Sequence, residues 1–559
     1  MHAAAALMTA LRSAGVRHLF GNPGTTELPF LDALDGSDLH YVVGLQEATV
    51  VAAADGYAQA TGAVGVANVH VAPGLANALS ILHNAARSRS PVLLTAGQQD
   101  TRLLVHEPIL AGDLVRMAEP FTKWAHEIGR ADEAVSALQR ALTIALTPPT
   151  GPVFLSLPMD LMTEEVEAPA PLARAAPSAP RPGVPGTADV ARACGLLAGA
   201  RAPVIVAGDG VGRAPDGVAT LTRLAEVLGA RVYGEPIYRR TNFPGDHPLW
   251  RGGLYPSPPA VRKALDDADV VLIAGADVFT WFLHGPGGPF RPGVPVIQIA
   301  DDPRQVGRSY PVDLAFTTAI TPTLRLIGDE LTERLSDPQR AAAAERRAQL
   351  ERVRADFVAR TRAAAEAEAE RAPISPAYLM HALAGVLPDD AIIVDESASS
   401  LPHVLRHLPF KRPGSFYGSK TGTLGWAMGA AIGVQLAEPR RKVVVTIGDG
   451  SVMYAPQALW TAAHERLPIT YVVANNASYA ILKAGMATLG LAGAKKGFYP
   501  GMDLTAPEVD YVRLAGSLGV RAVSVQKSRE LHDALAESLA HRGPSLVDVS
   551  IDRGVKGGV

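Results

Sequence analysis

Short apolar runs alternate with helical patterns along nearly the whole chain. The runs are rich in Val, Ile and Leu, and most end in Gly, Asp or Asn. They are VRHLFG, LHYVVGL, GVANVH, PVLLTAG and GPVFLSLP, then PVIVAGDG, DVVLIAGAD and VPVIQIAD, and finally AIIVDES, KVVVTIGDG, PITYVVANN and PSLVDVSI. Continuous apolar runs followed by helices are typical of parallel strands buried on both faces. The pattern therefore predicts an α/β protein of doubly wound parallel sheets.

Two segments without strand-like runs separate these runs into three groups. The stretch 167–186 is rich in proline and alanine and lacks periodicity, which predicts an exposed connector. The stretch 337–373 reads as an Ala/Glu/Arg helix that prolines end. A chain of 559 residues is too long for one core and, at ~150 residues per domain, fits three to four domains, of which we expect three. We expect domains over 1–165, 187–335 and 374–559.

Composition narrows the classes of partner. A net charge of -3 with 19% charged residues gives no basic excess for nucleic acid or anionic membranes. No apolar run reaches the ~18 residues of a membrane span, and MHAAAALMTALRSAG reads as a first helix. Cys194 is the only cysteine, which excludes an intrachain disulfide and fits a reducing cytoplasm. We expect a cytoplasmic protein that acts on a small molecule.

The most specific local signal follows two neighbouring predicted strands. One strand ends at Gly448, Asp449 and Gly450, and the next strand ends at Asn475 and Asn476. Glycines at a strand-to-helix turn let backbone N–H groups approach a phosphate. Carboxylate and amide oxygens at adjacent strand ends suit a hard cation such as Mg²⁺. The pattern predicts a pocket for a diphosphate bridged by magnesium.

A second signal is a carboxylate in an apolar setting. Glu47, in HYVVGLQEATV, is flanked by apolar residues and an alanine run. Burying an ionised carboxylate without a partner costs several kcal/mol. We therefore interpret Glu47 as a buried functional group, although a first-turn glutamate that interacts with the helix dipole would instead stay exposed.

These motifs resemble the thiamine-diphosphate (ThDP)-dependent enzymes of the pyruvate decarboxylase and acetolactate synthase superfamily, whose cofactor motif is GDG, a spacer of 20-odd residues, then NN. The resemblance covers essentially the whole chain and is closest to the benzoylformate decarboxylases. It rests on GNPGTTELPFL, LQEA, ADGYAQA, TAGQQ, GVQLAEP and IGDGS. It implies pyrimidine-binding, middle and diphosphate-binding domains, in that order.

The resemblance also implies the cofactor contacts. Glu47 would hydrogen-bond N1′ of the aminopyrimidine, so that the cofactor can deprotonate its own thiazolium carbon. Mg²⁺ would be held by the side chains of Asp449 and Asn476 and the carbonyl of Ser478. Leu424 would prop the cofactor into its V shape, and the carbonyl of Gly422 would accept from its amino group. The other implied cofactor contacts are Ala398, Ser399, Gly448, Gly450, Ser451 and Tyr479.

Two further residues are implied to act on the substrate. His70 matches an active-site histidine that can shuttle protons, and Thr25 stands where the benzoylformate decarboxylases have a serine that contacts the substrate carboxylate. A strand-end histidine that is merely hydrogen-bonded is the alternative. The two halves of each family site come from different subunits, so we expect a homodimer or dimer of dimers with Glu47 of one chain facing Asp449 of another.

Some positions depart from that pattern. A second family histidine aligns near Phe282, whereas His284 lies two positions later. Gly418 and Gly485 replace phenylalanines of an aromatic pocket, which predicts a more open wall. Lys420 and Lys483 lie nearby and would bind an anion or simply be solvated. GDGVG at 208–212 lacks a full dinucleotide fingerprint, so it reads as a middle-domain turn and FAD is not expected.

The hypothesis is a ThDP- and Mg²⁺-dependent carbon–carbon lyase that decarboxylates a 2-oxo acid to an aldehyde. The first alternative is a carboligase of the acetolactate synthase type, in which the intermediate attacks a second carbonyl compound. The other alternative is a non-catalytic binding protein that kept the fold.

Overall fold

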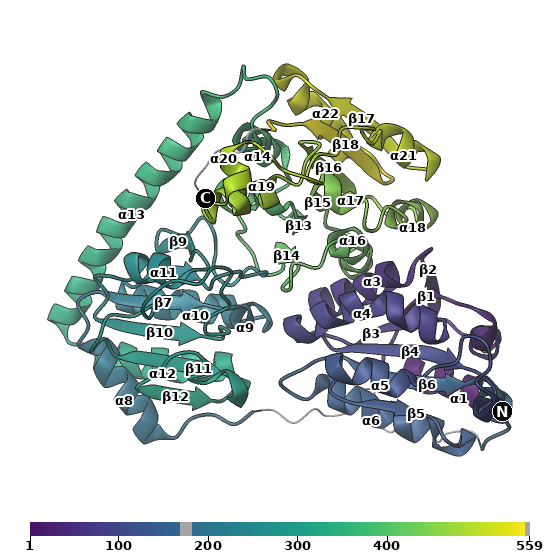
Figure 1. Ribbon diagram of the computed structural model, residues 1–559. Coiled ribbons are helices and arrows are strands. Elements are labelled where there is room, and N and C mark those ends of the chain that lie inside the picture. The colour runs from purple at the N-terminus through teal and green to yellow at the C-terminus, as the bar shows by residue number, and fades with distance from the viewer. Residues whose placement is uncertain (168–181, 554–559) are drawn as a thin grey trace.

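The computed structural model describes residues 1–167 and 182–553 and contains three parallel six-stranded sheets, each covered by helices (Figure 1). The predicted fold class is thereby confirmed. The predicted connector at 167–186 lies largely outside the described residues. Among the described helices, none combines the length and apolar character needed to cross a bilayer.

The first sheet has the strand order β2-β1-β3-β4-β6-β5. Its strands are β1 (His18–Asn22), β2 (His40–Val43), β3 (Gly65–Val69), β4 (Val92–Gln98), β5 (Ala125–Glu127) and β6 (Val153–Pro158). Its helices are α1 (Ala3–Ser13), α2 (Leu28–Asp32), α3 (Glu47–Thr61), α4 (Val71–Ser88), α5 (Leu114–Ala118), α6 (Ala134–Leu146) and α7 (Met159–Thr163). The predicted N-terminal helix is α1.

The second sheet has the order β12-β11-β10-β7-β8-β9. Its strands are β7 (Pro203–Ala207), β8 (Arg231–Gly234), β9 (Trp250–Gly253), β10 (Val270–Ala274), β11 (Val296–Ala300) and β12 (Leu314–Thr317). The helices are α8 (Thr187–Ala198), α9 (Asp209–Gly212), α10 (Gly217–Leu228), α11 (Pro258–Ala264), α12 (Ile320–Arg334) and α13 (Asp337–Glu366).

The third sheet has the order β14-β13-β15-β16-β18-β17. Its strands are β13 (Ile392–Glu396), β14 (Phe416–Gly418), β15 (Val443–Gly448), β16 (Thr470–Asn475), β17 (Arg521–Val525) and β18 (Ser545–Ser550). The helices are α14 (Pro376–Val386), α15 (Leu401–His407), α16 (Trp426–Ala437), α17 (Asp449–Val452), α18 (Ala458–His464), α19 (Ala480–Thr488), α20 (Ala492–Lys495), α21 (Tyr511–Ser517) and α22 (Ser528–Ala540).

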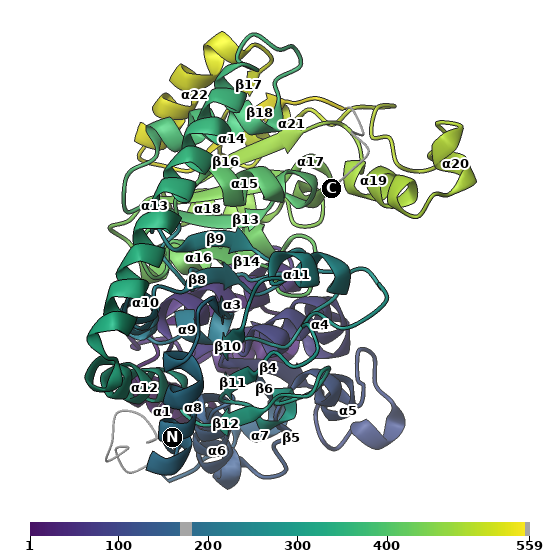
Figure 2. The ribbon, with the colours of Figure 1, turned by 90° about the vertical axis from the view of Figure 1, so that its left-hand side faces the viewer.

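Helix α13 runs along the outside of the molecule, from the middle sheet toward the third (Figures 1 and 2). At 1.5 Å per residue it is about 45 Å long. Arginines of this helix bind the middle domain. Arg346 donates to the carbonyl of Leu228 and Arg354 to that of Gly245. The predicted helix at 337–373 is therefore present, and it ends before the prolines.

The first and third domains meet through α3 and α16. Glycines let the two backbones touch, because a Cβ at Gly56 would overlap the carbonyl of Ala430 and one at Gly433 would overlap that of Ala53. A buried carboxylate completes this contact, since Asp55 accepts from the indole of Trp426 at 2.7 Å. The contact fixes how the third domain sits on the first.

Candidate functional site

The carboxyl ends of β15 and β16 bring the predicted magnesium ligands together. The two strands are parallel neighbours, with Gly448 paired to Ala474. Asp449 is 4% exposed, and burial raises its pKa to about 6, against the opposing effect of backbone N–H groups that include those of Gly450 and Ser478. Asn476 is also buried, and its Oδ1 accepts from the backbone of Ser478 at 3.0 Å.

At these strand ends, the protein leaves no room for a side chain at Gly450. Gly450 and Ser451 begin the turn after β15 and both are buried. A Cβ at Gly450 would lie 2.5 Å from the ring of Tyr479, so no larger residue fits without a shift. Hard oxygen donors beside the backbone N–H groups of a strand-to-helix turn fit a magnesium-bound diphosphate. The donor set thus agrees with the group that the sequence implied.

Glu396, at the end of β13, is a residue that sequence reasoning missed. It binds the backbone at the start of α16. Its two carboxylate oxygens accept from the backbone of Gly425 at 2.6 Å and of Ala427 at 2.8 Å. It therefore holds the start of α16 and, with it, the adjoining Leu424. Gly422, two residues earlier, has φ +71, a conformation that favours glycine.

The short 3-10 helix η6 (Ala398–Ser400) follows β13. Ala398 is exposed and has φ +39, a rarely occupied backbone conformation, while Ser399 is partly buried. This turn and the GDGS turn lie at the carboxyl ends of the adjacent strands β13 and β15. The structure therefore places the predicted diphosphate contacts on one edge of one sheet.

Glu47 is the first residue of α3 and is only partly buried in the single chain. Gln46 caps the helix, accepting from the backbone of Thr49 at 3.1 Å. The amide of Asn77 donates to Glu47 Oε2 at 3.0 Å. The expectation of a fully buried carboxylate is therefore wrong for the single chain, because the apolar neighbours of Glu47 face the core behind the helix and leave its end open.

A carboxylate that is buried beside His70 is Glu27, which is 1% exposed and which the sequence did not single out. It accepts hydrogen bonds from the backbone of Gly24 at 2.8 Å and of Gly97 at 2.7 Å. Its Oε1 accepts from the hydroxyl of Thr26 at 2.9 Å, and its Oε2 lies 2.8 Å from Nδ1 of His70. Four partners on three segments fix this carboxylate.

His70 and Glu47 lie on either side of one glycine. A Cβ built at Gly74 would lie 3.2 Å from Oε1 of Glu47 and 3.4 Å from Cβ of His70. His70 is partly exposed, and the next residue, Val71, has φ +36, a strained conformation for a β-branched residue. Thr25 is exposed at the start of the 3-10 helix η1 (Thr25–Glu27). The predicted catalytic residues Thr25, Glu47 and His70 thus follow the carboxyl ends of β1, β2 and β3, which are neighbours in the sheet.

Neither predicted lysine is free to bind an anion in the way we expected. Lys420 is buried, and its Nζ lies 2.8 Å from Asp209 and 3.0 Å from Glu235 of the middle domain. Lys483 forms an ion pair with Asp503 and is mostly buried. Both expectations, anion binding and simple solvation, are therefore wrong, because carboxylates distant in sequence neutralise both ammonium groups.

The pocket wall is opened at only one of the two predicted positions. A Cβ at Gly485 would meet nothing within 4 Å, as expected for an open wall. A Cβ at Gly418 would lie 2.8 Å from Cδ of Arg239, a residue of the middle domain. The side chain of Arg239 thus occupies the space beside Gly418.

His284 lies in the loop between β10 and β11 of the middle domain. It is exposed in a loop that lines a cavity of about 450 Å³ with Trp281, Phe282 and Tyr310. GDGVG at 208–212 follows β7 and forms the short α9 with Gly208 as its N-cap, as the expected middle-domain turn.

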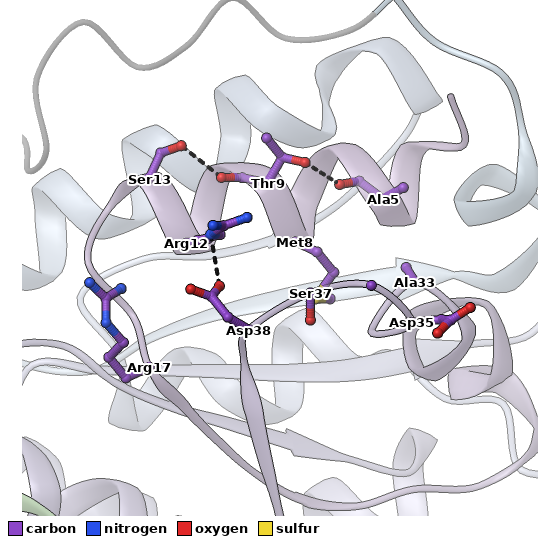
Figure 3. A pocket seen from close by; sticks show the side chains of 11 residues that line it. Ala5, Met8, Thr9, Arg12, Ser13, Arg17, Ala33, Asp35, Ser37 and Asp38 are labelled. Carbon is purple, nitrogen blue, oxygen red and sulfur yellow. Dashed lines mark hydrogen bonds and ion pairs between the residues drawn. The ribbon is translucent and has the colours of Figure 1, made fainter.

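A second recess, of about 460 Å³, is also separate from the candidate site (Figure 3). It lies on α1 and the segment before β2, beside the ion pair of Arg12 and Asp38, which are 2.7 Å apart. No residue that we predicted for the site lines it.

Comparison with known families assigns all three domains. The chain matches "Thiamine pyrophosphate enzyme, N-terminal TPP binding domain" over residues 1–117. It matches the central domain of the same enzymes over 190–327 and their C-terminal TPP binding domain over 399–549.

Individual relatives extend over almost the full chain. A benzoylformate decarboxylase of Pseudomonas aeruginosa is 34% identical, with 96% of this chain and 97% of the relative covered. A probable acetolactate synthase large subunit of Methanocaldococcus jannaschii is 28% identical over 99% of this chain and 92% of the relative.

Solved structures give the same result. A thiamine diphosphate-dependent 4-hydroxybenzoylformate decarboxylase of Rhodococcus jostii RHA1 superposes with a TM-score of 0.86 at 31% identity, covering 98% of this chain and 100% of the other. Benzoylformate decarboxylase of Polynucleobacter necessarius reaches 0.86 at 28% identity, covering 100% and 99%. The chain therefore belongs to the decarboxylase and acetolactate synthase superfamily of thiamine-diphosphate-dependent enzymes, as a carbon–carbon lyase.

Proposed function

We propose that this chain catalyses the ThDP- and Mg²⁺-dependent, non-oxidative decarboxylation of a 2-oxo acid to an aldehyde. One observation carries the proposal. His70, oriented by the buried Glu27, lies across Gly74 from Glu47, so a proton-exchanging group and a carboxylate face the same space. The similarity to benzoylformate decarboxylases supports the choice of a 2-oxo acid.

The third domain would hold the cofactor. Asp449, Asn476 and the carbonyl of Ser478 would ligate Mg²⁺, with Gly448 and Tyr479 flanking them. The diphosphate would lie against Ala398, Ser399, Gly450 and Ser451. Leu424 and the carbonyl of Gly422 would support the two rings. When bound, ThDP supplies a nucleophilic carbon and accepts the electrons released as CO₂ leaves.

Glu47 would hold a proton against N1′ of the aminopyrimidine. Its carboxylate is oriented by the amide of Asn77, which binds Oε2, and among the described residues Oε1 has no hydrogen-bond partner and lies beside Gly74. A hydrogen bond between a carboxylate and a ring nitrogen is stronger where water is excluded. In the assembled protein, a second subunit would cover this end of α3.

His70 would move the proton that completes the aldehyde. Because Nδ1 faces Glu27, Nε2 is the nitrogen left to exchange a proton with the substrate. Thr25 would donate a hydrogen bond to the substrate carboxylate before it leaves. We further propose that Glu47 of one subunit faces Asp449 of another, in a cytoplasmic homodimer or dimer of dimers.

The proposal is tested by measuring CO₂ release from a panel of arylglyoxylates and aliphatic 2-oxo acids, with ThDP and MgCl₂ present. We expect turnover of at least one compound, and a loss of about 100-fold or more in the His70→Ala variant. Glu351→Ala, on the exposed face of α13, is the matched control and should retain activity. If no compound of the panel releases CO₂, the decarboxylase proposal is refuted.

A carboligase is the second candidate function. The empty space beside Gly485 leaves room for an acceptor compound, and acetolactate synthases are among the relatives. Product analysis with one 2-oxo acid, with and without an acceptor aldehyde, separates the two functions. A carboligase gives a 2-hydroxy ketone as its main product, whereas a decarboxylase gives the free aldehyde.

A further inference from the structure

One arginine of the middle domain, Arg239, lies at the edge of the candidate site. Beyond β8, the chain turns through Ile237, which has φ +60, and returns beside β14. Arg239 donates its backbone N–H to Asp209 Oδ1 at 2.9 Å and accepts from the backbone of Gly418 at 3.1 Å. Arg240 then forms a bridge with Tyr417. The backbone of Arg239 is therefore held from both domains.

The side chain of Arg239 points along the edge that carries the cofactor contacts. Its Cδ fills the space above Gly418, which pairs with Asp395 of β13. The chain from Asp395 leads directly to Ala398 and Ser399, and the chain from Gly418 leads to Gly422. The side chain thus lies beside Gly418 and near Asp395 and Glu396, on the two strands that lead into turns that we propose to hold the cofactor.

Within the described residues, this guanidinium has no anionic partner. Its Nε is fully buried and has no hydrogen-bond partner, and it forms no ion pair. The nearby carboxylates are committed elsewhere: Asp395 to Ser397 and Thr446, Glu396 to the backbone of α16, and Asp209 to Lys420. A largely buried cation without a partner is costly, and an arginine offers five N–H donors.

This situation differs from that of the two lysines in the same region. Lys420 and Lys483 are both neutralised by carboxylates of this chain. Burial lowers the pKa of Arg239, and the charges of Asp395, Asp209 and Glu396 oppose that effect, but none of these carboxylates lies within ion-pair distance of its guanidinium. The donors of Arg239 therefore remain available to a ligand.

We propose that Arg239 binds the second carboxylate of a dicarboxylic 2-oxo acid. This inference rests on the proposed decarboxylase function and names the class of its substrate. A guanidinium binds a carboxylate through two parallel hydrogen bonds, which fixes orientation as well as charge. The carboxylate next to the ketone leaves as CO₂, one proton replaces it, and the distal carboxylate remains on the aldehyde product.

The test uses matched substrates that differ in the distal charge. The pairs are 2-oxoglutarate with 2-oxohexanoate, and 4-carboxybenzoylformate with benzoylformate, assayed on the ThDP- and Mg²⁺-loaded protein. We expect the parent to prefer the diacid of at least one pair by about tenfold or more in kcat/KM. Arg239→Gln should lower kcat/KM for that diacid about 10- to 100-fold and leave its neutral partner within about threefold.

The charge-conserving Arg239→Lys variant should keep part of the preference, since lysine supplies charge without the bidentate geometry. The ratio within one variant is independent of how much protein folds. A parent that favours the neutral compound of both pairs, or equal losses for both members in Arg239→Gln, would mean that Arg239 only fills space and would overturn the inference while leaving decarboxylation intact.

A binding measurement separates this inference from the proposed function. Glutarate, which lacks the ketone, should raise the Tm of the parent loaded with ThDP and Mg²⁺ and should not raise that of Arg239→Gln. If no 2-oxo acid releases CO₂ but glutarate still depends on Arg239, the anion site stands and the decarboxylase proposal fails. If glutarate shifts neither protein and no diacid is preferred, the anion site is refuted.

Discussion

Nδ1 of His70 lies 2.8 Å from Oε2 of Glu27, and this contact selects the ring nitrogen that can exchange protons. The backbone N–H groups of Gly24 and Gly97 and the hydroxyl of Thr26 hold the carboxylate in place. The ring itself packs so closely on Gly24 that a Cβ there would overlap it. The position and the tautomer of His70 therefore depend on Glu27 and on the groups that hold its carboxylate.

Glu27→Gln should lower kcat about 10- to 100-fold, because the amide cannot fix the His70 tautomer as a carboxylate does. A merely structural role would lower Tm and leave the pH profile of kcat unchanged. We expect instead that the limb due to His70 shifts in pH. A profile with the parent's shape, together with unchanged kcat, would remove Glu27 from the mechanism.

At this scale, the sequence revealed residues that sit in contiguous motifs and missed those defined by tertiary contacts. Asp449 and Asn476 are recognisable because each ends a strand after a regular pattern. Glu27 lies in a visible motif, but its burial depends on His70 and Gly97, which are far along the chain. Arg239 and the partners of Lys420 are set by the packing of one domain on another, which local pattern does not encode.

Strand position decided which elements the sequence could predict. Central strands such as β4, β10 and β15 are buried on both faces and give continuous apolar runs. Of the six described strands without such a run, five are short strands at sheet edges, β5, β9, β12, β14 and β17, and the sixth is β8, beside the edge strand β9. In β12 buried and exposed residues alternate, so half of the apolar signal is lost.

The adjacent ends of β15 and β16 make a prediction about metal and cofactor binding. ThDP with MgCl₂ should raise the Tm of the parent, since ligands that bind only the folded state add about 2.7 kcal/mol of stability at 100 times Kd. Asp449→Asn removes the charged Mg²⁺ ligand and should abolish most of that rise. EDTA should reverse the rise in the parent. An equal rise in Asp449→Asn would exclude this site.

At the scale of the molecule, two largely buried ionic contacts join the middle domain to the other two domains. Lys420 of the third domain binds Asp209 and Glu235 of the middle domain, and Arg89 of the first domain binds Asp277 and Asp301. Removing one member of a buried pair leaves an uncompensated charge. The mutual orientation of the domains should therefore be sensitive to Lys420.

Lys420→Met should lower the free energy of unfolding by about 3–5 kcal/mol, measured by urea denaturation. The matched control is Lys411→Met, whose partner Asp389 lies 2.9 Å away in an exposed pair. That pair should contribute at most about 1 kcal/mol. Equal effects of the two substitutions would show that the buried contact adds nothing to stability.

Glu235 gives the same region a pH dependence. Burial raises its pKa from the usual 4.5 to about 7, with Lys420 opposing and Asp209 adding to the shift. Between these values the folded chain binds the proton more readily than the unfolded chain, so the free energy of unfolding falls as pH rises from 4.5 to 7. Glu235→Gln should flatten that slope in denaturation at pH 5, 6, 7 and 8; parallel slopes would contradict the assignment.

Sites shared between subunits predict complementation. Glu47→Ala and Asp449→Asn should each be nearly inactive alone. If one subunit supplies Glu47 and the other Asp449, a mixed dimer contains one intact site. Unfolding and refolding an equal mixture should then restore roughly a quarter of parental activity, because about half of randomly paired dimers are mixed. No recovery in verified mixed dimers would place both residues in one subunit's site.

The glycine contact between α3 and α16 also constrains how small molecules reach the cofactor. Backbones already in contact at Gly56 and Gly433 cannot approach further, and the indole of Trp426 is tied across the seam to Asp55. Sliding of the first domain on the third would break these backbone contacts and the hydrogen bond. Entry and exit of reactants are thus left to smaller movements, and the arm formed by α19 and α20, which stands out from the body in Figure 2, lies outside this contact.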